Sequence, residues 1–231
     1  MRLTIFLALS MCLQPFVAAA QDPSSFPSVP MTSRTLQVQQ QAEDVFERTD
    51  YKRAFFIYRN ELAPIGDKYG QYMVGYMYLT GKGVEEDIVA ASAWYRLAAE
   101  RGIKEFMQTS DQLMDSLDDE QIALSDQQFI ELRKKYGDLV LLIRAVRDDY
   151  ELLRSRTGSR LSGSSSMLTV VDPNSSGSVR SGANYYGSVE KRIEARLEFI
   201  AEHTSIEIID LNSMNMSEIE SRVNEQLEEL D

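Results

Sequence analysis

Few side chains in this sequence have both the type and the spacing that acid-base, nucleophilic or metal chemistry requires. His203 is the only histidine and Cys12 the only cysteine among the 231 residues. A Ser-His-Asp triad depends on a histidine base, and a zinc site usually needs several histidine or cysteine ligands. We interpret His203 as a helix-end residue that the helix dipole favours. These counts support neither a triad hydrolase nor a zinc enzyme.

Other patterns that resemble binding motifs fail on spacing. One acidic group is Glu85-Glu86-Asp87, and the other consists of Asp115, Asp118, Asp119 and Glu120. Neither has the alternate-residue spacing of an EF-hand loop, so we interpret both as helix caps and solvated surface. The Gly-Lys-Gly at 81–83 lacks the length and the preceding strand of a phosphate loop. The sequence therefore predicts no catalytic residue, metal ligand or cofactor, although a carboxylate pair that cleaves glycans stays an alternative.

The charge balance argues against nucleic acid as a partner. Asp and Glu outnumber Lys and Arg by 36 to 24, which gives a formal net charge of −12. A chain of this charge is repelled by phosphate backbones and by anionic lipid. The basic residues at 133–135 follow acidic residues on a helical stretch, which is typical of a solvated helix face.

The elements that must position any functional residue are marked most clearly between residues 69 and 102. Two amphipathic stretches flank a glycine-containing turn, and each is too short to bury its apolar face alone, which predicts stacking on neighbouring helices. Gly81 and Gly83 are expected to end the first helix, and Asp87 to cap the second. Gly75 inside the first helix costs about 1 kcal/mol relative to alanine, which indicates a close approach by another backbone.

These residues resemble the Sel1-like repeat, a bacterial relative of the tetratricopeptide repeat. The family pattern combines a Leu-Gly-x-x-Tyr core, a Gly-x-Gly-Val turn, an aspartate, an Ala-x-x-Trp-Tyr motif and an Ala-Ala-x-x-Gly end. The matching residues here are Val74 (in the Leu position), Gly75, Tyr78, Gly81, Gly83, Val84, Asp87, Ala91, Trp94, Tyr95, Ala98, Ala99 and Gly102. Because these positions are structural in the family, the resemblance implies a stacked helical fold that binds proteins, and it implies no catalytic residue.

Internal repetition extends the pattern in both directions. Three upstream residues precede their counterparts by 37 positions: Asp50, Ala54 and Tyr58 before Asp87, Ala91 and Tyr95. Ala63 and Gly66 precede theirs by 36 positions, so one residue is inserted upstream. We predict a degraded helix pair from about residue 34 and a third, capping unit from residue 104. The expected fold is all-α, a short α-solenoid of Sel1-like helix pairs over residues 34–136.

The remaining segments differ in composition. In order, we expect a signal peptide at 1–20, a Pro-rich linker at 21–33, an extension helix at 137–155, a flexible Ser/Gly-rich linker at 156–186 and C-terminal helices at 187–231. Short strands at 167–171 and 206–211 are an alternative within these segments. Ser125 and Gln128 form a candidate capping box where the helix at 118–136 restarts.

The N-terminus indicates export. An apolar run ends in an alanine pattern at Ala20, which predicts signal-peptide cleavage before Gln21. The run is interrupted and shorter than the roughly 20 apolar residues of a membrane span, so no stable span is expected after cleavage. Cys12 makes a lipoprotein the alternative, but Met11 fits poorly where a small residue is required. We expect a periplasmic or secreted protein whose mature chain has no thiol.

Three residues of the first repeat helix are the candidate binding residues: Gln71, Tyr72 and Tyr76. The family packing pattern needs them least, and tyrosine is enriched at protein interfaces. We predict that they contact an unidentified envelope protein or peptide, so that the chain acts as an interaction scaffold. The alternative for the tyrosines is packing against neighbouring helices. The alternative functions are an envelope enzyme that acts on a glycan or peptide through unrecognised carboxylates, and a structural protein that self-associates through its C-terminal helices as a coiled coil.

Overall fold

The computed structural model describes residues 26–27, 32–155, 169–171 and 179–203. This part of the chain is helical, as predicted, apart from one small antiparallel sheet. The helices are α1 (Ser33–Glu47), α2 (Tyr51–Ile57), α3 (Lys68–Thr80), α4 (Ile88–Ala99), α5 (Lys104–Met114), α6 (Asp119–Tyr136), α7 (Asp138–Ser155) and α8 (Gly182–His203). A π-helical turn, η3 (Tyr58–Leu62), and a 3-10 turn, η4 (Ala63–Ile65), follow α2. The strands β1 (Thr169–Val171) and β2 (Val179–Ser181) form the sheet.

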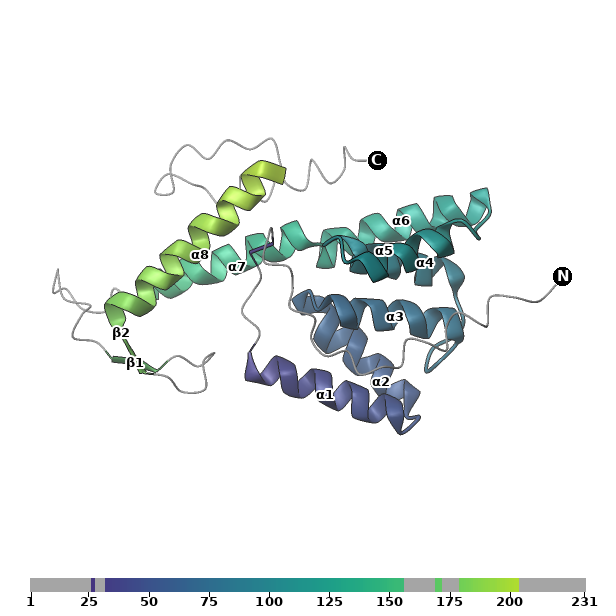
Figure 1. The fold of residues 1–231 in the computed structure, drawn as a ribbon, viewed down its shortest axis with the longest axis horizontal. Coiled ribbons are helices and arrows are strands. Elements are labelled where there is room, and N and C mark those ends of the chain that lie inside the picture. The colour runs from purple at the N-terminus through teal and green to yellow at the C-terminus, as the bar shows by residue number, and fades with distance from the viewer. Residues whose placement is uncertain (1–25, 28–31, 156–168, 172–178, 204–231) are drawn as a thin grey trace.

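Helices α1 and α2, and then α3 and α4, pack as consecutive pairs, and α5 and α6 both pack on α4, which confirms the predicted helical repeat array (Figure 1). The pair α3–α4 lies in the middle and contacts the preceding pair on one side and α5 and α6 on the other. Trp94 of α4 is 3% exposed and stacks on Tyr136 of α6, with ring centroids 5.9 Å apart. Tyr78 of α3 packs edge-to-face on Phe55 of α2 at 5.3 Å. The aromatic residues of the middle pair therefore fill the spaces between pairs, as stacked repeats require.

The turn between α3 and α4 has the predicted glycine conformations. Gly81 has φ +66°, and Gly83 has φ +78° in direct contact with the preceding pair. A Cβ atom on Gly83 would lie 2.2 Å from the backbone oxygen of Tyr51. At Gly75 a Cβ atom would lie 2.8 Å from the ring of Tyr95 and 3.2 Å from the backbone oxygen of Ala91, which confirms the predicted close approach of another backbone. Asp87 caps α4 by accepting a hydrogen bond of 2.9 Å from the backbone N–H of Ala90.

The inserted residue of the preceding pair forms the π-helical turn. The repeat offset changes between Tyr58 and Ala63, and the structure places η3 between these two residues. The backbone N–H of Ala63 bonds to the carbonyl of Tyr58, which is the five-residue step of a π-helix. The helical segment then ends at Gly66, which forms a left-handed cap with φ +77° and is the counterpart of Gly102. The insertion therefore lengthens one turn and leaves both ends of the helix in repeat register.

The predicted capping box at Ser125 and Gln128 is wrong. Helix α6 begins after Asp118, which forms a capping box with Gln121, and it runs without a break to Tyr136. Ser125 is fully buried inside this helix and donates a 3.0 Å hydrogen bond to the hydroxyl of Ser92 on α4. Its hydroxyl links α6 to α4, so the capping pattern in the sequence was coincidental.

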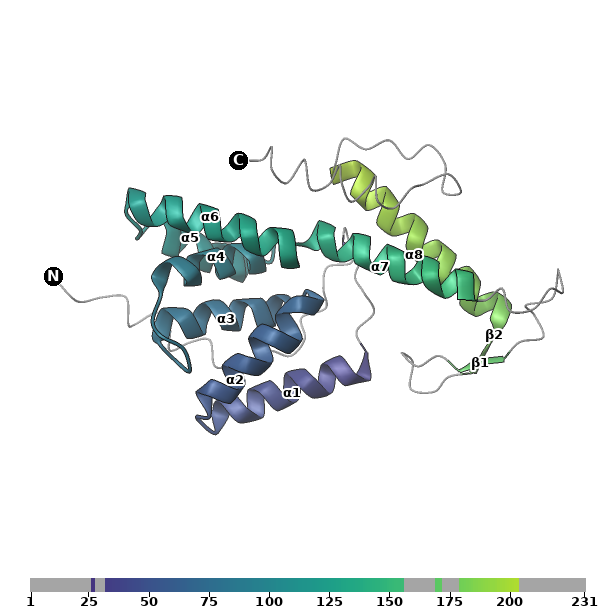
Figure 2. The ribbon, with the colours of Figure 1, turned by 180° about the vertical axis from the view of Figure 1, so that it is seen from behind.

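A helical hairpin of α7 and α8 extends from the end of the solenoid, as Figure 2 shows from behind. Only Gly137 separates α6 from α7, and a Cβ atom there would lie 2.5 Å from the carbonyl oxygen of Arg133. The buried residues that α7 and α8 share are Leu142, Ile143, Val146, Tyr185, Val189, Ile193, Leu197 and Ile200. The apolar stripe of α8, which the sequence offered for self-association, thus packs on α7. The last predicted helix, after residue 203, lies outside the described residues.

Strand and helix boundaries near the hairpin differ from the expected ones. Strand β1 forms within the 167–171 run, but its partner is β2. The 206–211 run, considered as its partner, lies outside the described residues. Helix α8 begins at Gly182, so both β2 and the first turn of α8 lie within the segment expected to be a linker.

Near the N-terminus, Phe26 joins the solenoid to the hairpin. Its ring lies 4.1 Å from the guanidinium carbon of Arg101, at the end of α4. The same ring packs edge-to-face on Phe199 of α8, with centroids 5.4 Å apart. The described N-terminal residues therefore contact both parts of the molecule.

Candidate functional site

Three tyrosines follow one face of α3, and we call them the tyrosine row: Tyr69, Tyr72 and Tyr76. Their spacing of three and four residues places them on the same side of the helix, and all three are half-buried. Tyr72 stacks on Phe106 of α5 with centroids 4.7 Å apart. Tyr76 lies 6.1 Å from the ring of Phe46 on α1. Aromatic contacts therefore link the row on α3 to α5 at one end and to α1 at the other.

Lys82 closes one end of the row. Its ammonium nitrogen lies 4.8 to 5.4 Å from the ring centroids of Tyr76, Phe46 and Tyr51. It also donates a 2.7 Å hydrogen bond to the hydroxyl of Tyr76. These cation–π contacts hold the turn between α3 and α4 against the preceding helix pair. They also fix the position of the Tyr76 side chain.

The third candidate binding residue, Gln71, lies inside the protein. Its side chain is 0% exposed. Its amide nitrogen donates to the carbonyls of Ala63 at 3.2 Å and Tyr136 at 3.4 Å, and its oxygen accepts from Lys68 at 3.1 Å. A buried amide needs such partners, which explains why a polar residue stands here. Gln71 therefore presents no surface to a partner, whereas Tyr72 and Tyr76 are only half-buried.

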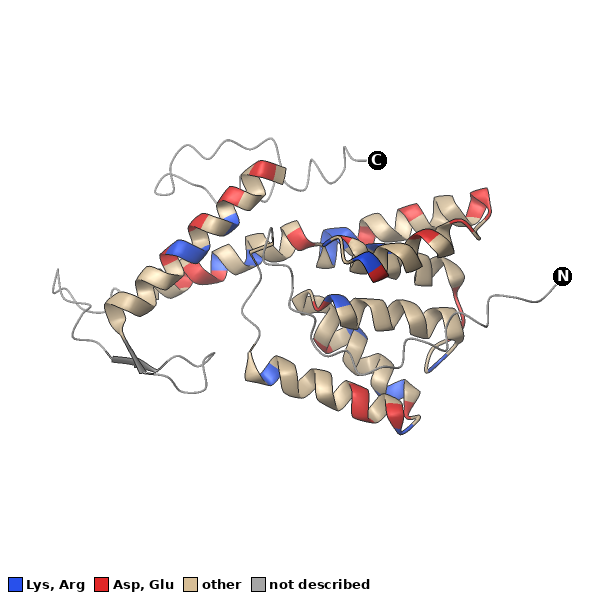
Figure 3. Ribbon diagram, viewed as in Figure 1, with Lys and Arg blue, Asp and Glu red and all other residues tan. Residues whose placement is uncertain are grey.

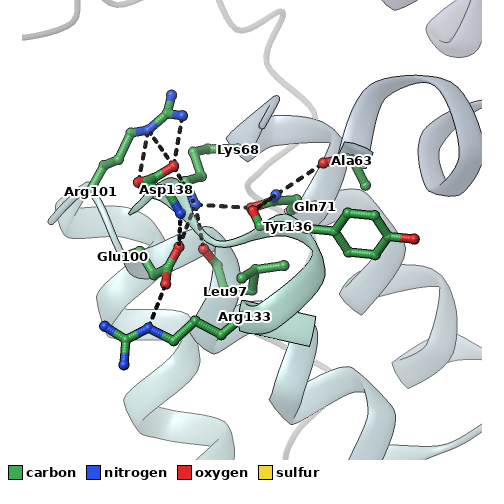
Figure 4. Close-up of polar contacts among 9 residues, drawn as sticks. All are labelled: Ala63, Lys68, Gln71, Leu97, Glu100, Arg101, Arg133, Tyr136 and Asp138. Atoms are coloured by element: carbon green, nitrogen blue, oxygen red, sulfur yellow. Dashed lines mark hydrogen bonds and ion pairs between the residues drawn. The ribbon is translucent and has the colours of Figure 1, made fainter. Parts of the chain in front are cut away.

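Around Gln71 the structure assembles a group of charged residues that we call the elbow cluster: Lys68, Glu100, Arg101, Arg133 and Asp138 (Figure 4). The Lys68 ammonium is 4% exposed and lies 3.0 Å from Glu100 and 3.2 Å from Asp138. It also donates to the carbonyl of Leu97 at 2.8 Å. A fully buried lysine is rare unless it is paired in this way.

The two arginines complete the elbow cluster from opposite sides. Arg101 donates to both carboxylate oxygens of Asp138, at 2.9 to 3.2 Å, and Arg133 donates to Glu100 at 3.1 Å. Glu100 also accepts from the backbone N–H of Asp138 at 3.2 Å. Every charge therefore has an opposite charge beside it, and the cluster fixes α7 where it leaves α6. The cluster stabilises a joint between helices and has no free group for acid-base chemistry.

Sequence reasoning did not find the elbow cluster. Lys68 is separated from Glu100 by 32 residues along the chain, and Arg101 from Asp138 by 37. No local spacing rule links such residues. The one available signal was a charged residue, Lys68, at the start of an otherwise apolar helix.

On the other side of α3, the carboxylates of α1 form no ion pair with any residue that the structure describes. We call Glu43, Glu47 and Asp67 the acidic seam; Figure 3 shows that acidic residues gather on the C-terminal half of α1. Asp67 caps α3 by accepting from the backbone N–H of Gly70 at 2.5 Å, and it accepts a second bond from Gln39 of α1. Burial raises the pKa of Asp67 despite these hydrogen bonds. Desolvation, followed by the charges of Glu47, Asp44 and Asp67, raises the pKa of Glu43.

The residues considered for catalysis or metal binding are helix caps or exposed side chains. His203 is exposed at the last position of α8, where its ring stacks on Phe199. Asp87 and Asp118 are helix caps, and Glu85 and Glu86 are exposed. Among the residues that the structure describes, no group of three histidine, cysteine or acidic side chains is arranged to hold a metal ion. None of the described helices is both long and apolar enough to cross a bilayer.

Comparison with protein families matches residues 68–103 to the Sel1 repeat. Comparison with curated proteins and with solved structures finds no match for this chain. The matched residues begin at Lys68, the first residue of α3, and end just beyond Gly102, so the match covers the middle helix pair. Repeats of this kind are typically non-catalytic and imply protein binding. The chain therefore carries a Sel1 repeat at residues 68–103, a member of the tetratricopeptide-like superfamily of helical repeats.

Proposed function

We propose that this protein is a scaffold of the cell envelope that binds another protein through the tyrosine row of α3. The position of Tyr72 and Tyr76 supports this proposal most directly. Both rings are half-buried on one face of α3, and both are fixed by neighbours: Phe106 beside Tyr72 and Lys82 beside Tyr76. Aromatic side chains that are already ordered lose little entropy on binding, which favours them as interface anchors.

The experiment that tests this site is crosslinking in living cells. A photo-reactive phenylalanine derivative replaces Tyr72, which keeps an aromatic ring at the stacking position. The matched control places the same residue at Leu124 of α6, an apolar side chain that is 47% exposed. We expect one specific adduct with another protein from position 72 and none from position 124. Identical adducts from both positions, or an adduct from position 124 alone, would contradict the assignment.

The envelope location depends on the predicted signal peptide, which lies outside the described residues. We propose that export removes residues 1–20. N-terminal sequencing of the protein from its native host is then expected to begin at Gln21. A mature chain that begins at a lipid-modified Cys12 would support the lipoprotein alternative, and an intact N-terminus in the cytoplasm would contradict both.

A further inference from the structure

The outer side of α2 and η3 carries Phe56, which at 58% has the largest exposed fraction of any large apolar side chain that the structure describes. Basic residues surround it, and we call this surface the basic face: Lys52, Arg53, Phe56 and Arg59, all of them exposed. Lys52 precedes Phe56 by four residues and Arg59 follows it by three, spacings that place them on one side of a helix. The opposite side of the same segment packs in the core.

The charges of the basic face are not neutralised within the described part of the chain. Lys52, Arg53 and Arg59 form no ion pair with any described residue. Asp50 caps α2 by accepting a hydrogen bond of 3.4 Å from the backbone N–H of Arg53. Residues 51–62 include three basic residues and one acidic residue, so this segment carries +2 in a chain whose net charge is −12. Such a surface favours an acidic segment that also has apolar residues to cover the phenylalanine ring.

The chain itself contains a segment of this chemistry at residues 217–231, which lie outside the described part. Six acidic residues and one basic residue give this segment a net charge of −5. Its apolar residues recur at steps of three and four, which predicts a single apolar stripe on a helix: Ile219, Val223, Leu227 and Leu230. The segment therefore has both properties that the basic face would select.

A series of contacts limits the distance between the end of α8 and the basic face. The ring of Phe199, in the last turn of α8, lies 5.4 Å from that of Phe26, which lies 4.1 Å from the guanidinium carbon of Arg101. A Cβ atom on Gly66 would lie 3.2 Å from a guanidinium nitrogen of Arg101, and Gly66 ends the helical segment that holds Phe56. With side-chain lengths and helical rise included, the last residue of α8 is no more than about 40 Å from Phe56. Residues 204–216 can span about 45 Å, so they are long enough to bridge this distance.

We propose that residues 217–231 dock on the basic face of their own chain as an amphipathic helix. The apolar stripe covers Phe56, and acidic residues beside the stripe pair with Lys52, Arg53 and Arg59. Because the segment is tethered to α8, its effective concentration at the basic face is high, and docking needs no second molecule. This inference is independent of the proposed scaffold function, since it involves α2 and η3 rather than the tyrosine row of α3.

Intramolecular crosslinking of the purified full chain tests the proposal. A photo-reactive phenylalanine derivative replaces Phe56 and keeps an aromatic ring at the centre of the basic face. The matched control places the same derivative at Leu124 of α6, which is 47% exposed. We expect peptide mass spectrometry to find crosslinks from position 56 to residues 217–231 within single chains, and none from position 124. Crosslinks to this segment from both positions, crosslinks only between two chains, or none from position 56 would overturn the proposal.

Charge reversal on the basic face provides a second measurement. Lys52→Glu/Arg53→Glu is combined with the derivative at position 56, and both substituted residues are exposed, so the melting temperature should not change. We expect the crosslink yield to fall about tenfold, because the charges that attract the acidic segment now repel it. The matched control, Lys104→Glu/Lys135→Glu at exposed positions on α5 and α6, should stay within about twofold. An equal yield in the two variants would show that charge does not hold the segment and would overturn the proposal.

Discussion

On the side of the Sel1 repeat that faces α6 and α7, five charged side chains pair with one another, whereas on the side that faces α1 three carboxylates form no ion pair with any described residue. Both groups touch the same helix, since Lys68 is the first residue of α3 and Asp67 is its cap. Adjacent residues thus belong to opposite electrostatic environments. The elbow cluster joins helices within the chain, and the acidic seam leaves charge available at its surface.

The difference teaches how one repeat can serve both folding and binding. A buried group of charges stabilises only when each member is paired, because the desolvation of a lone charge is costly. Exposed carboxylates cost little in water, so an unpaired group can persist at a surface. Sites that bind a partner are therefore more plausible where charge is left unpaired than where it is satisfied internally. Four predictions test this contrast, and they are ordered by the size of the expected effect.

The largest effect is expected from the elbow cluster. Lys68→Met removes the buried cation and leaves Glu100 and Asp138 without their shared partner. We expect the free energy of unfolding to fall by about 3 kcal/mol, measured by urea denaturation. Lys104→Met, at an exposed position on α5, is the control and should change it by less than about 0.5 kcal/mol. Equal stabilities of the two variants would mean that the elbow cluster contributes nothing.

The next effect concerns the turn that docks the repeat on the preceding helix pair. Gly83→Ala places a Cβ atom against the backbone of Tyr51 in addition to the strain of a left-handed φ. Gly102→Ala has a similar φ of +70°, with no atom within 4 Å of the added Cβ. We expect a loss of about 3 kcal/mol in the first variant and about 1 kcal/mol in the second, measured by thermal and urea unfolding. Similar losses in both would exclude a role for the contact with Tyr51.

A smaller effect separates hydroxyls with and without a partner. Tyr58→Phe removes a buried hydroxyl that has no hydrogen-bond partner among the described residues, so the free energy of unfolding should stay the same or rise by up to about 1 kcal/mol. Ser125→Ala removes the hydroxyl that donates to Ser92, so this variant should lower the free energy of unfolding by about 1 kcal/mol. A clear destabilisation by Tyr58→Phe in chemical denaturation would show that its hydroxyl is already satisfied in the free protein.

The smallest effect is the pH dependence of the seam. Burial raises the pKa of Asp67 above its ordinary value of 3.8, so the folded protein binds this proton more tightly than the unfolded chain. The contribution of Asp67 to stability is therefore complete below pH 3.8 and is lost as the pH rises through the folded-state pKa. Asp67→Asn cannot titrate. We expect the stability of the wild type relative to Asp67→Asn to increase as the pH falls from neutrality, measured by urea unfolding at several pH values. A flat difference would contradict the raised pKa.

Local sequence signals located the repeat and its turns. Glycines at positions 81 and 83 and the cap Asp87 act within a few residues of their partners, so the sequence contains their whole physical basis. The change of repeat offset from 37 to 36 residues likewise located the insertion before the structure showed it as a π-helical turn. The same local reasoning failed at Ser125, where a capping pattern occurs inside a continuous helix.

The surroundings of the candidate binding residues were only partly predictable. Tyr72 and Tyr76 lie at the surface of α3, as the packing pattern indicated, although both also pack against neighbouring helices. Gln71, one residue before Tyr72, is buried against Ala63 and Tyr136. Consecutive helix positions differ by about 100°, so a neighbour in sequence can face the interior. Which face is covered depends on α6, whose position the pattern of α3 does not contain.

The sequence by itself determined the helical class, the repeat unit, its glycine turn and its caps, because each depends on residues within one or two helical turns of each other. Only the tertiary structure decided that Lys68 is paired and buried, while the carboxylates of the acidic seam form no ion pair within the described part of the chain. That distinction arises when segments more than 30 residues apart pack together, as Lys68 and Glu100 do across 32 positions. Burial and charge pairing are properties of this packing, so they appear only once the helices are assembled.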